Sequence, residues 1–122
     1  MGLSIGASTN NTSIQYAGVG VTLATDNTIN GLNLTGTANA AIGIEDGGGS
    51  VTTLGGTLII DNTSILGSGK AVDIDQGGNL NVTLDTLSSQ NSTTQGVQLA
   101  GTANSGTGLI SGTFSATAGT IQ

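Results

Sequence analysis

The sequence predicts an all-β protein that winds as a parallel β-solenoid of about four to five coils. Short stretches of alternating apolar and polar residues recur along it, and each ends at a glycine-rich or Asn-Thr corner. Charged residues make up only 7% of the 122 positions. Thr, Val and Ile favour strands, and no stretch shows the 3.6-residue period of an amphipathic helix. The paired alternation of apolar residues indicates an ordered, thin aliphatic core rather than a disordered tract.

The clearest unit is GKAVDIDQGGNLNVTL at residues 69–84. In its first strand Val72 and Ile74 point to one face, whereas Asp73 and Asp75 point to the other, because strand side chains alternate. Glycines then break the strand at a corner, and the alternation resumes at 80–84. Too few residues separate the two strands for a helix, so strand, corner and strand form one part of a coil.

The same unit recurs on both sides. AIGIEDGG at 41–48 matches AVDIDQGG at 71–78 with an offset of 30 residues, GVQL at 96–99 follows with an offset of 25, and GVGV at 18–21 is an earlier copy. Irregular spacing of this kind indicates a solenoid with insertions at its corners. The alignment predicts that six apolar residues are buried and stacked in register: Ile42, Ile44, Val72, Ile74, Val97 and Leu99.

A second element repeats between these units as LATDNTI at 23–29, LIIDNTSI at 58–65 and VTLDTL at 82–87. Its alignment predicts that Asp26, Asp61 and Asp85 stack at one corner. Like charges about 4.8 Å apart repel unless water or a cation lies between them, and calcium takes oxygen ligands. These residues are the candidate calcium site, although neither an EF-hand loop nor a GGxGxD repeat is present. The favoured alternative is that each aspartate caps its turn by bonding to the backbone.

Composition excludes several classes of partner. The net charge is −6 and Lys70 is the sole basic residue, which argues against binding nucleic acid or an anionic membrane. No apolar run reaches the roughly 18 residues of a spanning helix, so no membrane insertion is predicted. We expect residues 1–122 to form a single solenoid segment and a piece of a longer repeat protein.

Catalytic groups are scarce. The chain has no His, Cys or Arg, which removes Ser-His-Asp and Cys-His catalysis and imidazole metal sites. Paired carboxylates remain for glycoside cleavage, and the candidates at matching corners are Glu45, Asp46, Asp73 and Asp75. A solvated acidic face is the favoured alternative, because Tyr16 and Phe114 are the only aromatic residues that could line a sugar-binding groove. We therefore predict no enzyme, no catalytic residues and no cofactor-binding residues.

The chain resembles the right-handed parallel β-helix of bacterial autotransporter and filamentous-adhesin passengers, within the wider pectin-lyase-like group. The resemblance rests on AIGIEDGG, AVDIDQGG and GVQLAG, and on the DNT turns at 26–28 and 61–63. It implies a right-handed coil and a secreted, extracellular protein of the bacterial cell surface with a structural or adhesive role. It also implies a short ladder of stacked asparagines at Asn27 and Asn62.

Three functions follow as hypotheses. The first is a structural rod whose polar loops, above all SSQNSTTQ at 88–95, contact glycans or host cells. The second is a polysaccharide lyase or tailspike-like depolymerase. The third is ice binding by threonines on a flat solenoid face. The ends at 1–18 and 102–122 show no amphipathic capping helix, so end-to-end self-association or further coils of a longer chain are expected there through seven apolar residues: Leu3, Ile5, Ile14, Leu109, Ile110, Phe114 and Ile121.

Overall fold

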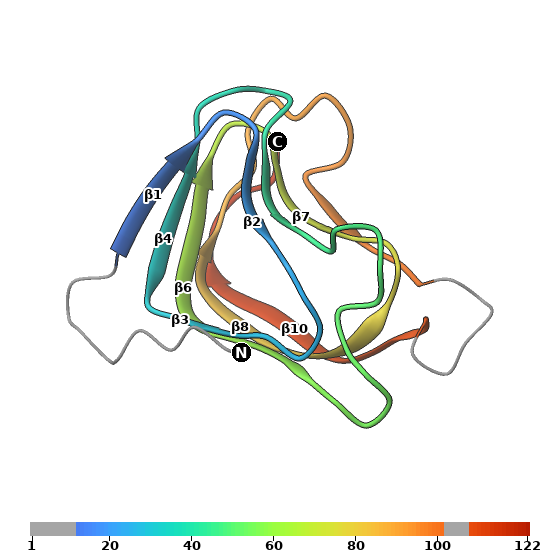
Figure 1. Cartoon of the computed structure of the whole chain (residues 1–122). Coiled ribbons are helices and arrows are strands. Elements are labelled where there is room, and N and C mark those ends of the chain that lie inside the picture. The colour runs from blue at the N-terminus through green and yellow to red at the C-terminus, as the bar shows by residue number, and fades with distance from the viewer. Residues whose placement is uncertain (1–11, 102–107) are drawn as a thin grey trace.

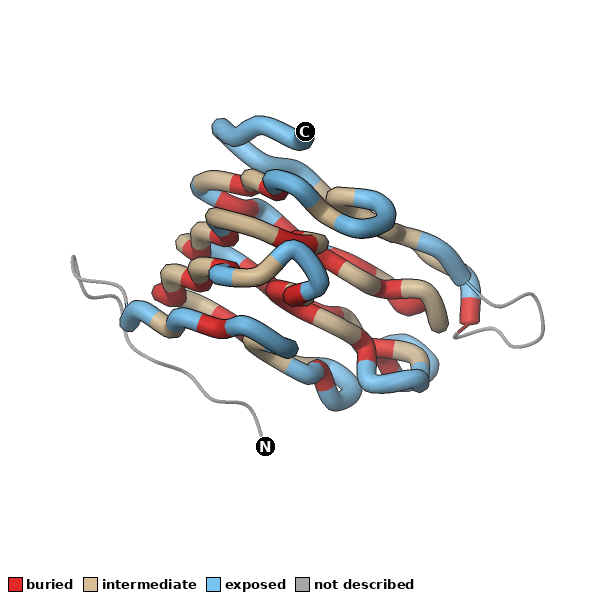
Figure 2. The backbone as a smooth tube through the Cα atoms, turned by 90° about the horizontal axis from the view of Figure 1, so that it is seen from above, coloured by how far each residue is buried: buried red, intermediate tan, exposed pale blue. Residues whose placement is uncertain are grey.

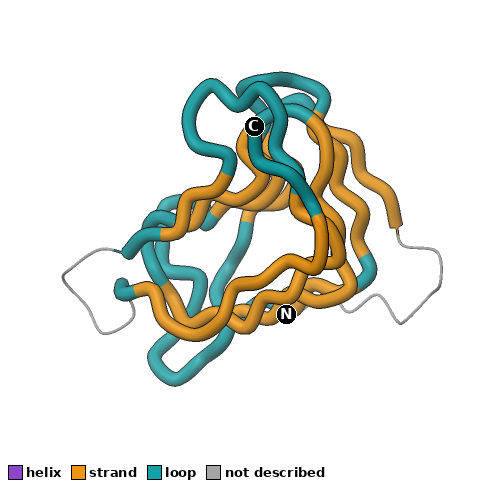
Figure 3. The backbone as a smooth tube through the Cα atoms, turned by 180° about the vertical axis from the view of Figure 1, so that it is seen from behind, coloured by secondary structure: helices purple, strands orange, loops and turns teal. Residues whose placement is uncertain are grey.

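The computed structural model describes residues 12–101 and 108–122, and all regular structure in these residues is β-strand (Figure 3). The predicted edge residues Leu3 and Ile5 lie outside them. Within the described part there is no helix, and hence none long and apolar enough to cross a membrane. The strands are β1 Thr12–Tyr16, β2 Val19–Thr22, β3 Thr28–Asn30, β4 Leu32–Gly36, β5 Ile42–Glu45, β6 Leu58–Gly67, β7 Lys70–Ile74, β8 Gly78–Leu87, β9 Val97–Leu99 and β10 Ile110–Ala118.

The strands form two parallel sheets. The first has the order β1-β4-β6-β8-β10, with β3 also paired to β6, and the second has the order β2-β5-β7-β9. Each strand pairs with the strand that the chain forms on its next passage through the same sheet, so the chain winds round a common interior (Figure 1). We call one such passage through both sheets a winding. The prediction of an all-β chain with parallel pairing is confirmed, and the arrangement is compatible with a β-solenoid.

The long strands β6 and β8 each cover two positions of a winding. The first part of β6 pairs with β3, and its second part pairs with β4. Between these two parts the chain bends at Asn62, which has a φ of 48°. The N–H of Gly31, which has a φ of 80°, donates to the carbonyl of Asn62. This is the left-handed region, which asparagine and glycine tolerate better than other residues. The first sheet therefore folds along a line and encloses the core on two sides.

The register of the second sheet agrees with the predicted alignment between β7 and β9 and differs from it between β5 and β7. Val72 lies opposite Val97 and Ile74 opposite Leu99, as predicted. Ile44, however, lies opposite Val72 rather than Ile74, and Ile42 lies opposite Lys70. A shift of two residues keeps every side chain on its own face, so the alternating pattern alone could not distinguish the two registers.

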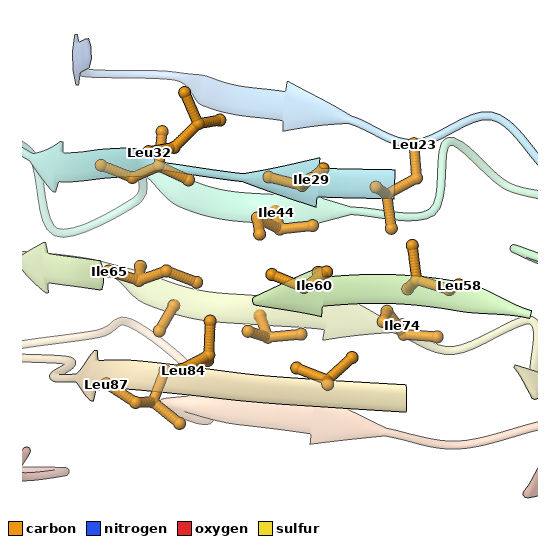
Figure 4. Packing of buried hydrophobic residues seen from close by; sticks show 14 of the residues in the cluster. Leu23, Ile29, Leu32, Ile44, Leu58, Ile60, Ile65, Ile74, Leu84 and Leu87 are labelled. Atoms are coloured by element: carbon orange, nitrogen blue, oxygen red, sulfur yellow. The ribbon is translucent and has the colours of Figure 1, made fainter. Parts of the chain in front are cut away.

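Aliphatic side chains fill the space between the two sheets (Figure 4). The chain is most buried in its middle windings and more exposed toward both ends (Figure 2). Of the six predicted core residues, Ile44, Val72 and Ile74 are buried, whereas Ile42, Val97 and Leu99 are only half-buried. Val97 and Leu99 are half-buried because β9 is the last strand of its sheet and lacks a neighbour on one side.

Tyr16 closes the core at one end and is only 7% exposed. Burial disfavours the charged phenolate and raises the pKa of Tyr16 from 10.0 to about 12. The folded state therefore holds this proton more tightly than the unfolded state, so the stability that it contributes is lost as the pH rises from about 10 through 12.

Tyr16 is the sole tyrosine, so absorbance near 295 nm reports it alone. We expect a titration midpoint about two units higher in the native protein than in denaturant, and equal midpoints would contradict this burial.

Candidate functional site

Two of the candidate catalytic carboxylates lie side by side on the outer face of the second sheet. Glu45 on β5 is directly opposite Asp73 on β7. Both already have partners, because Thr22 Oγ1 donates to Glu45 Oε1 at 2.9 Å and Lys70 Nζ donates to Asp73 Oδ2 at 2.8 Å. Lys70 Nζ also donates to Gln98 Oε1 on β9 at 3.0 Å. These side-chain bonds thus connect β2 to β5 and β7 to β9.

The second oxygen of Asp73, Oδ1, is buried and has no hydrogen-bond partner. The neighbouring Lys70 ammonium lies 2.8 Å from Oδ2 and supplies the nearest opposite charge. Asp73 is thus held in a partly buried ion pair with Lys70. An ion pair in this position fits a structural role better than a general acid or base.

Asp46 connects the corners of two windings. Its Oδ1 accepts the N–H of Gly48 at 3.0 Å, and its Oδ2 accepts the N–H groups of Asp75 and Gln76 at 2.7 and 2.8 Å. The side chain of Asp75 instead accepts from Gln76 Nε2. Of the four predicted catalytic carboxylates, Asp46 and Asp75 therefore do not converge with Glu45 and Asp73 on a shared site. The hydrogen bonds that Asp46 accepts from the next winding also fix the observed register of β5 against β7, which differs from the predicted alignment.

We expect Asp46→Asn to lower the free energy of unfolding by about 1–3 kcal/mol, because hydrogen bonds to an ionised acceptor are stronger than those to a neutral one. An amide also places an N–H₂ group among backbone donors. Asp61→Asn is the matched control, since Asp61 is exposed and the change should stay within about 0.5 kcal/mol. Urea unfolding measures both variants. Equal effects would show that Asp46 does not stabilise the contact between windings.

The three predicted calcium ligands are not in register. Asp61 lies opposite Asn30 rather than Asp26, and Asp26 is instead at a corner, where its carboxylate accepts from the backbone N–H and hydroxyl of Thr53. Asp85 lies at an irregularity of the β6–β8 pairing. The described residues hold no group of three or more Asp, Glu, His or Cys that could bind a metal. The stacked arrangement that motivated the calcium prediction is therefore wrong, and Asp26 bonds to Thr53 of another winding rather than capping its own turn.

The predicted asparagine ladder is also wrong. The side chain of Asn27 accepts from the N–H of Ala24 within its own turn. Asn62 Nδ2 instead lies 3.5 Å from Asn30 Oδ1. The two DNT motifs thus occupy different corners of the winding, although their sequences are the same.

Two shallow cavities lie at the corners. One, of about 330 Å³, is lined by polar atoms of Thr52, Asn79 and Ser111 and by the exposed side chains of Leu54 and Leu109. The other, of about 240 Å³, lies between the corner loops 39–42 and 92–94, with Lys70 in its lining. Neither of the two aromatic residues lines these cavities.

Both aromatic residues that could have stacked on a sugar are part of the core. Tyr16 is buried, and Phe114 is partly buried and packs against the core cluster. A depolymerase would need exposed aromatic rings beside its carboxylates, and the described surface offers none there. This arrangement does not favour the carbohydrate-active alternative.

The polar segment 88–95 is divided into two parts. Ser89 is fully buried, and its hydroxyl donates to the carbonyl of Gly69 at 2.6 Å, so the start of the segment continues the first sheet. Only residues 91–95 project, and the N–H of Thr93 donates to the carbonyl of Asn39 in the adjacent corner. The predicted loop is therefore shorter than its polar composition indicated. Composition alone does not show that a small serine can fit into the core when its hydroxyl finds a carbonyl.

The outer face of the first sheet does not carry a regular threonine array. One outward column, formed by residues in register, runs through Thr28, Ile59, Asn81 and Thr113. Threonine occupies only the two ends of this column. The arrangement does not favour the ice-binding alternative.

Fold and site together define an all-β chain of parallel sheets in which charged side chains connect successive windings. A comparison with known protein families, with curated proteins and with solved structures finds no match. The resemblance to autotransporter and adhesin passengers therefore stays a prediction.

Proposed function

We propose that this chain is a structural and adhesive segment of a secreted protein of the bacterial cell surface. In this proposal the winding is a right-handed parallel β-helix of about four to five coils, which acts as a stiff rod and presents loops to glycans or to other cells. Connections between parallel strands of one sheet are right-handed in nearly all proteins, which supports the proposed hand.

The observation that carries the proposal is how the charged side chains are used. Asp26, Glu45, Asp46 and Lys70 each bond across from one winding to a residue of another, and Asp73 is paired with Lys70 within β7. A catalytic centre needs such groups free to reach a substrate, whereas a rod needs them to resist sliding between windings. Their engagement therefore supports a structural role over an enzymatic one.

The projecting loops are the proposed contact surface. Residues 91–95 extend beside the corner 37–41, and together they border the cavity of about 240 Å³. The side chains of residues 91–95 carry hydroxyls and amides, which can hydrogen-bond to sugar hydroxyls without requiring charge. The rod would hold these groups away from the membrane that carries it.

The test measures binding and hydrolysis on the same samples. Fluorescently labelled protein is applied to beads coated with neutral and acidic polysaccharides, and to cells. We expect binding that Thr93→Ala with Thr94→Ala weakens severalfold, while Thr113→Ala with Thr117→Ala, in exposed positions of β10, leaves it unchanged. We also expect no release of reducing ends. Hydrolysis that Glu45→Gln or Asp73→Asn abolishes, or binding that is insensitive to the loop variant, would contradict the proposal.

A further inference from the structure

The geometry points to a second copy of this chain as the partner of the rod's ends: its β1 adds in parallel to the open edge of residues 118–122. This contact rests on the proposed rod and names what its end binds. Among the described strands, β1 pairs only with β4, and the C-terminal stretch pairs only with residues of the preceding winding. Within residues 12–101 and 108–122, both therefore present an unpaired edge of backbone N–H and C=O groups, which can add a further strand.

The register of the new contact follows from the columns within one copy. Ser13, Asn33, Ser64, Thr86 and Ala118 are successive partners in the first sheet. The isolated pairing of Ser89 with Ile121 extends the ladder to the end of the chain. Repeating the same step places Ser13 of the next copy beside Ala118, and Tyr16 of the next copy beside Ile121.

Electrostatics select the ends as the place where copies meet. The net charge of −6 makes copies repel one another. Strands β1, β2, β3, β4, β9 and β10 carry no charged side chain, and the charged residues lie between 26 and 85. Natural edge strands are usually protected by charge or proline, and neither protects these. An approach end to end therefore keeps the charged windings furthest apart.

Apolar groups at both ends also favour this partner. Ile121 is 50% exposed at the C-terminal edge, and Ile14 on β1 is only partly buried. Gly119 has no side chain at the position opposite Leu87, so Ile14 of the next copy can pack toward the end of the core. The proposed contact between copies is made through the first sheet. The main run of that sheet has five strands and includes both the first and the last strand of the copy, whereas the second sheet has four strands.

The test is disulfide trapping in the full chain, which has no cysteine of its own. Ser13→Cys with Ala118→Cys places two outward thiols in the predicted register. Within one copy these positions are four strand spacings apart, about 19 Å, which is too far for a disulfide. The matched control is Gln15→Cys with Ala118→Cys, which moves one thiol two residues along the same exposed face. Circular dichroism checks that both variants fold.

Mild oxidation should convert the Ser13→Cys variant into a ladder of covalent oligomers, severalfold faster than the Gln15→Cys variant. Raising the salt from about 0.01 M to 0.15 M should increase the yield, because the Debye length falls from about 30 to 8 Å and repulsion between copies weakens. Equal rates for the two variants, or monomers alone, would overturn the contact. Those outcomes leave the glycan-binding result unaffected, so failure of the contact is distinguishable from failure of the rod's proposed function.

Discussion

Ile74→Ala is expected to lower the free energy of unfolding by about 2–5 kcal/mol, the range for deleting most of a buried aliphatic side chain. Ile74 is fully buried at the end of β7, and it faces the interior between the two sheets (Figure 4). Removing it loses the transfer free energy of three carbons and leaves a cavity that the rigid ladders on either side cannot easily collapse.

The matched control is Ile59→Ala on the outer face of β6, where the side chain is 38% exposed. The same atoms are removed there, but water replaces them, so we expect a loss below about 1 kcal/mol. Denaturant unfolding with a common m-value measures both variants. If the two losses were equal, Ile74 would not lie in the core as the structure places it.

Gly67→Ala is expected to destabilise the protein by about 2–5 kcal/mol, through strained backbone and through overlap with a neighbouring strand. Gly67 ends β6 with a φ of 92°, and an added Cβ would lie 2.3 Å from the carbonyl oxygen of Gly36. That oxygen also accepts the N–H of Ser68, so it cannot move away without breaking a bond between windings.

Gly55→Ala separates the two causes. Gly55 has a similar φ of 81°, but nothing lies within 4 Å of an added Cβ. This variant should lower the free energy of unfolding only by the cost of placing alanine in left-handed backbone, about 1–2 kcal/mol. Thermal or urea unfolding of both variants gives the difference, which reports how closely the windings approach at Gly36. A larger loss at Gly55 than at Gly67 would contradict the close approach.

The sequence predicted the class of fold because period-two alternation is a local property. In β8 the alternation of buried and exposed positions follows directly from Leu80, Val82 and Leu84. Parallel pairing followed from the recurrence of the same unit, since each strand then lies beside its counterpart one coil away. The register between β5 and β7 was not predictable, since a shift of two residues preserves the pattern. There the corner bonds of Asp46 to the next winding distinguish the two registers, and such long-range bonds leave no local signal.

The candidate site was harder to predict because short motifs were matched without knowing at which corner of the winding each motif lies. The DNT motif at Asp26 follows β2, whereas the one at Asp61 lies inside β6. Corner insertions of different length place the same three letters at different points of the winding. The predicted alignment placed Glu45 opposite Asp75, whereas the structure places it opposite Asp73. The side chains that bond to Glu45 and Asp73 are those of Thr22 and Lys70.

The unequal number of strands in the two sheets has a consequence for any filament built from these copies. Each copy contributes five strands to the main run of the first sheet and four to the second. A filament joined through β1 would therefore be continuous along one flank and interrupted along the other. The interruptions would recur once per copy, about 24 Å apart, as evenly spaced notches one strand wide. Such an axial repeat would appear as a layer line in diffraction from aligned filaments, separate from the strand spacing of about 4.8 Å.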